Sequence, residues 1–262
     1  MTFDWLNVVA GFGVGVLVGL TGVGGGALMT PIMLLLFGVA PTTAVGTDLW
    51  FAAITKMVGG WVHGKRGTVD WRVLRLMFLG SLPLAVLTLI WLHYSGNGQT
   101  HNVMITRMLG GVLVLTSLAS VFRPAFHRVG TRLRDERPVM FKTLQPAATV
   151  LAGAILGFLV TFTSIGAGAL GAVMLLYLYP RRMKPSVLVG TDIVHAIPLT
   201  LIAGTGHLLL GNVNFSLLGM LLVGSIPGIV LGSLASSRAP EKLIRTLISV
   251  ILTAVGVKML WF

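Results

Sequence analysis

Long hydrophobic stretches separated by short polar segments dominate the chain. The first runs from Trp5 to Phe37 without a charged residue, and another runs from Pro146 to Tyr179. Further apolar stretches cover 45–62, 73–92, 103–122, 187–210, 215–235 and 242–261. Most of them approach the ~20 residues that an α-helix needs to cross the hydrocarbon core of a bilayer. Because strong period-two alternation is missing from the sequence, the pattern predicts an all-α polytopic membrane protein and not an outer-membrane barrel.

A glycine-rich interruption lies inside each of the two longest stretches. The first reads Thr21-Gly-Val-Gly-Gly-Gly-Ala27, and the second reads Thr163-Ser-Ile-Gly-Ala-Gly-Ala169. Glycine destabilises a helix interior by ~1 kcal/mol relative to alanine. A continuous helix over 5–37 would also be ~50 Å long, against a hydrocarbon core of ~30 Å. We therefore expect each stretch to form two short arms, either as a pair of crossings or as a re-entrant hairpin.

The second half of the chain repeats the plan of the first. At a displacement of 144 positions, Gly46-Thr47-Asp48 coincides with Gly190-Thr191-Asp192, and His63 coincides with His207. Repetition in a fixed register indicates a duplicated structural unit. We divide the chain into a first transmembrane repeat (1–122), a basic cytoplasmic linker (123–145) and a second transmembrane repeat (146–262).

The placement of charge indicates how the repeats are inserted. Only 10% of the 262 residues are charged and 55% are hydrophobic, whereas soluble domains carry about 25% charged residues. Sixteen of the 19 Lys and Arg residues lie beside apolar stretches, within 65–75, 123–142, 181–184 and 238–245. The matching loops of the two halves carry opposite charge, because 38–44, 94–102 and 208–215 contain neither Lys nor Arg. With basic loops in the cytoplasm, this predicts two inverted-topology repeats, eight to ten membrane segments and both termini outside the cell, in the inner (plasma) membrane.

Several classes of function are excluded by what the sequence lacks. The net charge of +12 does not fall on a basic helix with interleaved aromatic residues, so we expect no nucleic-acid binding. The chain has no cysteine, no nucleophile elbow, no His-Glu-x-x-His sequence and no Walker loop. We expect neither enzymatic activity nor a cofactor, and the histidines lack the spacing of a metal site.

Inverted repeats with broken helices are typical of secondary transporters, whose substrates bind near the midplane of the membrane. A helix that resumes after a break directs its free N–H groups and the positive end of its dipole at the gap, where an anion can bind. The alternative is that the glycines serve close helix packing through small residues. The candidate substrate-binding residues are Thr21, Gly22, Gly24, Gly25, Gly26, Thr163, Ser164, Gly166, Ala167, Gly168 and Lys56.

Ionisable residues inside the apolar stretches are candidates for coupling or gating. A cation at the bilayer centre costs about 2.5–3.5 kcal/mol on insertion scales, so Lys56 must attract the anion, pair with a carboxylate, or extend to the membrane surface. The two Asp residues of the Gly-Thr-Asp triplets either cap their own helices or bind a coupling H⁺ or Na⁺. The candidates are Thr47, Asp48, Thr191, Asp192, His63, His195 and His207.

The same residues resemble a known family. The series Thr21-Gly-Val-Gly-Gly-Gly-Ala-Leu-x-x-Pro31, then Gly38-x-x-Pro41-x-x-Ala44-x-Gly46-Thr47, then His63 and Gly67-x-Val69-Asp70-Trp71 is similar to the sulfite exporter TauE/SafE family, also called toluene sulfonate uptake permeases. The resemblance covers most of the chain and implies transport of sulfonates, sulfoacetate, sulfite or related anions. The second half departs from the pattern at Ser164 and Ala167, where the first half has glycine.

Taken together, the sequence predicts a plasma-membrane permease for small sulfur-containing anions, with alternating access around a site formed by two broken helices. The alternatives are an anion channel and a divalent-metal permease that uses His and Asp. The expected partners are the anion, the lipid bilayer and a coupling H⁺ or Na⁺. The transported anion, the direction of transport and the oligomeric state, a homodimer included, stay open.

Overall fold

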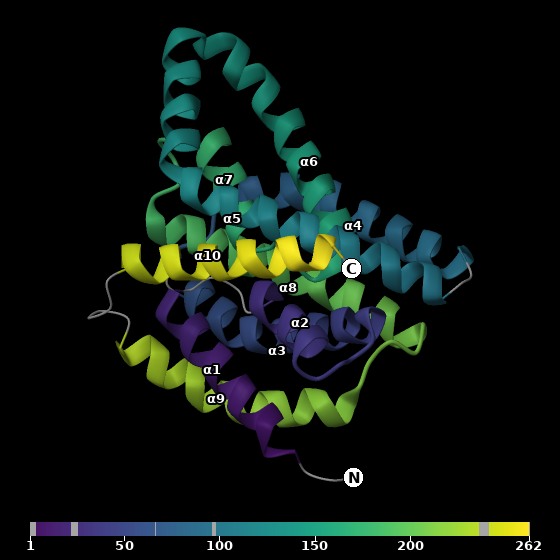
Figure 1. Cartoon of the computed structure of the whole chain (residues 1–262). Helices are drawn as coiled ribbons and strands as arrows, with labels where there is room; N and C mark the ends of the chain where they lie inside the picture. Colours follow the sequence, from purple (N-terminus) through teal and green to yellow (C-terminus); the bar gives the residue numbers. More distant parts are fainter. Residues whose placement is uncertain (1–3, 22–25, 66, 96–97, 236–240, 262) are drawn as a thin grey trace.

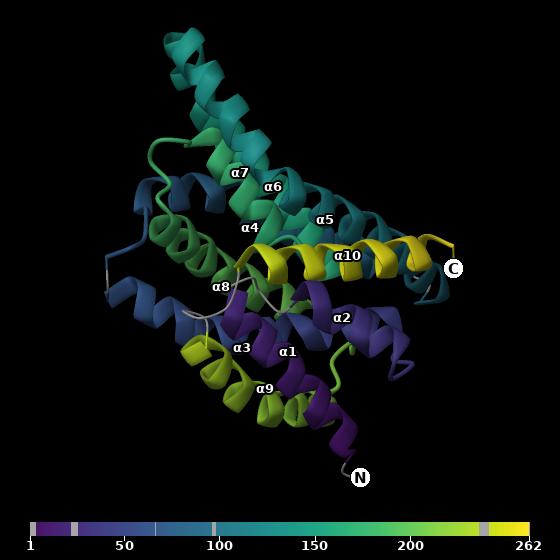
Figure 2. The same ribbon diagram turned by 60° about the vertical axis from the view of Figure 1, so that its left-hand side comes forward.

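The computed structural model of the chain describes residues 4–21, 26–65, 67–95, 98–235 and 241–261, without the side chains of 21, 26, 58–65, 98–100, 233, 235 and 241–245. The described residues form ten α-helices and no strand (Figures 1 and 2). The helices are α1 (Trp5–Thr21), α2 (Gly26–Leu35), α3 (Pro41–Lys65), α4 (Trp71–Tyr94), α5 (Gly98–Glu136), α6 (Pro138–Thr163), α7 (Ala169–Leu178), α8 (Pro185–Leu209), α9 (Phe215–Ala235) and α10 (Glu241–Leu260).

The all-α polytopic architecture is confirmed. Among the described residues, α4, α5, α6, α8 and most of α9 are long and apolar enough to cross a membrane. Large apolar side chains such as Leu79, Leu151 and Val223 are exposed on the outer surface of the bundle. In a bilayer these side chains face lipid, and the helical backbone bonds leave few polar groups unsatisfied there.

The second glycine-rich interruption breaks the helix as predicted. Helix α6 ends at Thr163 and α7 begins at Ala169. Between them Ser164 has φ +60°, Gly166 has φ +127° and Gly168 has φ +123°, a region of backbone conformation that favours glycine. In the first half, α1 ends at Thr21 and α2 begins at Gly26, and the intervening positions 22–25 lie outside the described residues.

Helices α6 and α7 form a hairpin. The side-chain amide of Gln145, near the start of α6, donates to the carbonyl of Leu178 at the end of α7. One turn further along α6, the Thr149 hydroxyl lies 2.8 Å from the Tyr179 hydroxyl. The end of α7 thus returns to the side from which α6 started. With ten residues, α7 is ~15 Å long, half the thickness of a hydrocarbon core.

Two helix pairs join the halves of the chain through glycine. A Cβ atom at Gly11 or Gly15 of α1 would collide with the backbone of α9, and one at Gly153 or Gly157 of α6 would collide with the backbone of α4. Glycines four residues apart let two helices approach closely, and this close packing stabilises helix association in lipid, where the hydrophobic effect does not favour it. Each pair unites one helix from the first half with one from the second, so the halves interlock.

Equivalent helices of the two halves run in opposite directions, as inverted repeats require. The N–H of Asn214, after α8, donates to Thr47 Oγ1 near the start of α3 over 3.0 Å. The N–H of Asp70, after α3, donates to Thr191 Oγ1 near the start of α8 over 2.9 Å. The start of each helix therefore lies beside the end of the other.

The charged and uncharged connections gather at opposite ends of the bundle. At the charged end, Arg182 forms an ion pair with Asp70, and Arg181 Nη2 lies 2.6 Å from Asp135 Oδ1. The basic linker proposed for 123–145 is helical on either side of Arg137 and forms the hairpin of α5 and α6 that projects beyond the other helices (Figures 1 and 2). Pro138, which lacks an N–H and favours the first turn, starts α6.

Candidate functional site

Three buried ionisable side chains from α3 and α8 meet the interruption between α6 and α7. Asp48 is fully buried, Asp192 is 5% exposed and Lys56 is 9% exposed. Lys56 interacts electrostatically with both carboxylates, yet among the described residues it forms no direct ion pair with either. We call Asp48, Lys56 and Asp192 the central triad.

Lys56 directs its charge at the helix break. Its Nζ lies 3.4 Å from the carbonyl oxygen of Ala167, inside the interruption. The suggestion that Lys56 extends to the membrane surface is wrong, because the side chain is almost entirely enclosed. The ammonium group has three N–H donors, and the Ala167 carbonyl occupies one of them.

The side chain of Asp192, a residue of α8, lies at the N-terminal end of α7. Its Oδ1 accepts the N–H of Gly168, one residue before the helix, over 3.3 Å. A Cβ atom at Gly171 would collide with the same oxygen, so the absence of a side chain there makes room for the carboxylate. The positive end of α7 faces the break as predicted, and the anion that it holds here is the protein's own carboxylate.

Asp48, the third member of the triad, lies among hydroxyl groups. Thr30 Oγ1 of α2 donates to Asp48 Oδ2 over 2.5 Å, and the Ser164 side chain approaches the same carboxyl group. Asp48 Oδ1 and Ser164 Oγ both lack a hydrogen-bond partner of normal geometry among the described residues. Two unpaired oxygens this close can share a proton or a water molecule.

The prediction that these Asp residues cap their own helices is wrong. Helices α3 and α8 begin at Pro41 and Pro185, so both carboxylates lie in the third helical turn, too deep to reach the free N–H groups of the first. The capping residue of α4 is Asp70, whose Oδ1 accepts the Val73 N–H.

Of the other predicted residues, Thr163 lies at the break, and the rest that the structure describes hold neighbouring helices and loops together. Thr163 Oγ1 donates to Leu159 O over 2.7 Å and accepts the N–H of Ile165, just past the end of α6, over 3.2 Å. Thr47 and Thr191 bind the loop of the opposite half. His195 is fully buried, and its Nε2 lies 2.9 Å from Ser81 Oγ. The side chains or whole residues at Thr21, Gly22, Gly24, Gly25, Gly26 and His63 lie outside what the structure describes.

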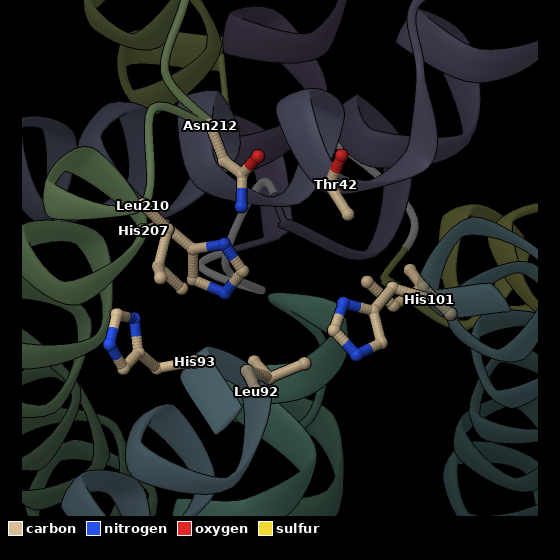
Figure 3. Close-up of a pocket in the computed structure, with 8 residues that line it drawn as sticks. Thr42, Leu92, His93, His101, His207, Leu210 and Asn212 are labelled. Carbon is tan, nitrogen blue, oxygen red and sulfur yellow. The ribbon is translucent and has the colours of Figure 1, made fainter. Parts of the chain in front are cut away.

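A cavity of about 190 Å³ opens at the uncharged end of the bundle (Figure 3). Histidine side chains from three helices line it, together with Thr42 and Asn212. They are His93 of α4, His101 of α5 and His207 of α8. Only His207 was singled out from the sequence.

Some residues at these sites carried little or no signal in the sequence. Thr30 follows the first interruption by one helical turn, and Ser81 belongs to a Gly-Ser-x-Pro sequence present in both halves, so each has a weak signal. His93 and His101 have no counterpart in the repeat and were not identified. Among the described residues, no three His, Asp or Glu side chains are placed to hold a metal ion.

Comparison with known proteins identifies the family. A family model described as sulfite exporter TauE/SafE matches residues 7–259. The probable membrane transporter protein YjnA of Bacillus subtilis is 38% identical over 255 residues, which cover 97% of this chain and 98% of that protein. The probable membrane transporter protein YunE of the same organism is 41% identical over 267 residues, with 97% and 96% covered. A probable membrane transporter protein of Methanocaldococcus jannaschii is 26% identical over 273 residues, with 97% and 94% covered.

No solved structure matches the chain significantly. The family match, in contrast, covers both halves, nearly all of both longest apolar stretches and every residue of the central triad. Helical spans, interlocked halves and near-full-length similarity to named transporters agree, and the chain belongs to the TauE/SafE family of membrane transporters.

Proposed function

We propose that the protein moves small sulfur-containing oxyanions, such as sulfonates, sulfoacetate or sulfite, across the plasma membrane by alternating access at the break between α6 and α7. The observation that carries the proposal is the position of Lys56. Its ammonium group lies at the break, 3.4 Å from Ala167 O, buried and without a direct ion pair among the described residues. A desolvated cation beside a glycine-rich turn attracts an anion more strongly than one in water.

The charge of the central triad favours an anion that arrives with a proton. With both carboxylates ionised, Asp48, Lys56 and Asp192 carry a net charge of −1, which repels an oxyanion. Protonation of one carboxylate makes the triad neutral and frees Lys56 to pair with the substrate. We therefore propose H⁺ as the coupling ion.

The position of Lys56 also argues against the divalent-metal alternative. The two carboxylates that would hold a metal both interact with this ammonium group. A divalent cation bound between them would lie next to a like charge in a medium of low dielectric constant, which costs several kcal/mol.

We propose that the first interruption, with Gly22, Gly24 and Gly25, supplies the other half of the substrate site, although these residues lie outside the described part of the chain. The support is the repeat itself, since α2 begins at Gly26 as α7 begins at Ala169. By the positive-inside rule we assign the charged end of the bundle to the cytoplasm and the cavity of Figure 3 to the outside.

Transport in liposomes tests the function. Purified protein should catalyse counterflow of radiolabelled sulfoacetate or sulfite, and should not move divalent metal ions. The Lys56→Met variant should lose at least about tenfold of the rate, since a hydrogen bond to a charged group contributes about 1.5–3 kcal/mol. The Lys56→Arg variant, which keeps the charge, should retain part of it.

Two results would contradict the proposal. Wild-type rates for Lys56→Met with every sulfur anion would remove this residue from the site. Flux without counterflow, at rates far above a carrier's, would instead identify an anion channel.

A further inference from the structure

The hairpin of α5 and α6 at the charged end, residues 123–145, carries an inference beyond transport, and we call it the basic hairpin. We propose that the basic hairpin and the end of α7 form a binding site for an anionic phospholipid of the cytoplasmic leaflet. The assignment of this end to the cytoplasm rests on the proposed function, whereas the lipid site itself rests on the lining, the charge and the exposed surface of the hairpin.

The length of α5 places the basic hairpin at the membrane surface. Helix α5 has 39 residues and is therefore ~58 Å long, against a hydrocarbon core of ~30 Å. Its apolar stretch ends at Phe122, and the residues that follow belong to the hairpin that projects beyond the other helices (Figures 1 and 2). The ion pair of Asp135 with Arg181 joins the hairpin to the charged end. Its tip therefore lies at the level of the headgroups or beyond them.

A cavity of about 200 Å³ lies between the two arms of the basic hairpin and the end of α7. Arg137, which separates α5 from α6, is the charged residue of its lining. Much of the remaining lining is apolar and includes Leu133, Leu144, Ala148 and Leu178. Arg137 and Ala148 lie ~16 Å apart along the chain axis of α6. A cation at one end and apolar side chains at the other match the headgroup and the acyl chain of a phospholipid.

The basic hairpin has an excess of positive charge. Positions 123–142 hold six Lys or Arg residues and two acidic residues, and both acidic side chains are already in ion pairs with arginines. Four of the basic residues form no ion pair within the described part of the chain, namely Arg128, Arg134, Arg137 and Lys142. Basic clusters directly beside a membrane-spanning helix attract the anionic lipids of the cytoplasmic leaflet.

Exposed apolar side chains on the same hairpin favour an amphiphile over a free anion. Val139 is 78% exposed, Leu144 55% and Met140 48%, and the last two also line the cavity. Apolar side chains exposed beside basic ones are typical of surfaces that lie in the membrane interface. A soluble anion would pair with Arg137 and leave the apolar lining in water, whereas a phospholipid covers both.

The cavity adjoins the helix that begins at the break. Tyr177 and Leu178, at the end of α7, contribute to its lining. The side-chain amide of Gln145 joins the same end of α7 to α6. A lipid bound in this cavity would therefore pack against both helices and hold the end of α7 in place.

Thermal unfolding of the purified protein in detergent tests the site. Dioleoyl phosphatidylglycerol should raise the midpoint of unfolding by several degrees, because a ligand that binds only the folded state stabilises it. Zwitterionic dioleoyl phosphatidylcholine, at the same mole fraction, should raise it by less than half as much. Glycerol phosphate, which has the headgroup charge without acyl chains, should leave the midpoint unchanged.

Arg137→Gln and Arg128→Gln form a matched pair of variants. Each removes one positive charge from the basic hairpin, but Arg128 is exposed and lies outside the cavity lining. Arg137→Gln should fold normally, because the Arg137 side chain does not cap α6. It should raise the phosphatidylglycerol concentration for the half-maximal shift at least about fivefold. Arg128→Gln should change this concentration less than about twofold at physiological ionic strength, where charges more than ~8 Å apart are largely screened.

Three results would overturn the lipid site. Equal shifts with the two phospholipids would show that the anionic headgroup is not recognised. Equal losses in the two variants would show that only the general charge of the hairpin attracts lipid, and a full shift with glycerol phosphate would assign the cavity to a soluble anion. Unfolding requires no transport, so a failure of this proposal is distinguishable from a failure of the transport function, which the Lys56 variants test.

Discussion

Asp192 is the residue whose position most constrains the transport chemistry. Its carboxylate accepts the Gly168 N–H at the start of α7, the same donor that an incoming oxyanion would need. In the proposed mechanism, substrate and Asp192 therefore compete for one amide. Protonation would remove the charge that holds Asp192 there, so the mechanism predicts that proton binding and anion binding favour each other.

Replacement of Asp192 tests this competition. The Asp192→Asn variant resembles the protonated, uncharged carboxyl group in shape and cannot ionise. We expect sulfoacetate exchange to persist and to become nearly independent of pH, while uptake driven by a pH gradient falls at least about tenfold, because the variant cannot carry the proton. Exchange and gradient-driven uptake in proteoliposomes measure the two quantities.

Asp48→Asn is the matched comparison, because its amide oxygen still accepts from Thr30. If Asp48 carries the coupled proton instead, Asp48→Asn will lose the coupling to the proton, and Asp192→Asn will remain coupled.

At the scale of elements, glycine decides which helices touch. Gly157 of α6 meets the backbone of α4 at Ser81, whereas Gly219 of α9 has open space around it. The two positions therefore respond differently to the same added methyl group, although both are glycines inside apolar helices.

A pair of alanine substitutions tests this distinction. Gly157→Ala should destabilise the protein by about 1–3 kcal/mol, the usual cost of overpacking. Gly219→Ala should be neutral or stabilising by up to ~1 kcal/mol, because alanine favours the helix. Thermal unfolding in detergent, followed by the fraction that remains monodisperse, measures both. Equal effects at the two positions would show that the α4–α6 contact is not close.

At the scale of the whole molecule, the ion pair of Arg182 with Asp70 closes the charged end. It links the connection between α3 and α4 to the connection between α7 and α8. The alternating access proposed above requires this end to open, so it predicts that the ion pair separates during each cycle.

Asp70→Asn isolates the ion pair, because Asn can still cap α4. Asn214 caps α9 in the equivalent way, with its Oδ1 3.0 Å from the Leu217 N–H. A partly exposed ion pair contributes up to about 1 kcal/mol to the free energy of the state that contains it. Its loss therefore shifts the population about fivefold toward the state open at the charged end. The labelling rate of a cysteine at Leu188, which is 1% exposed in this structure, should rise by that factor. An unchanged rate would mean that the pair does not hold this end closed.

Features that depend on the local sequence were predictable, whereas the roles of the buried ionisable residues were not. The spans, the helix break at Gly166 and the opposed directions of the repeats were all predictable, since they depend on local hydrophobicity, glycine content and charge. Lys56 and Asp192 were identified as buried ionisable groups because charge inside an apolar stretch is conspicuous. Their roles were not identified, because helix capping for Asp192 and extension to the membrane surface for Lys56 were the wrong alternatives.

By itself, the sequence determined that this is a polytopic helical protein built from two inverted halves with glycine-broken segments. Those features follow from the backbone's need for internal hydrogen bonds in lipid and from the length of an apolar helix. The tertiary structure alone decided that α1 pairs with α9 and α4 with α6, that Asp192 holds the end of α7, and that three histidines share a cavity. Such contacts join residues far apart in the chain, and only the packing of helices brings their side chains within reach of one another.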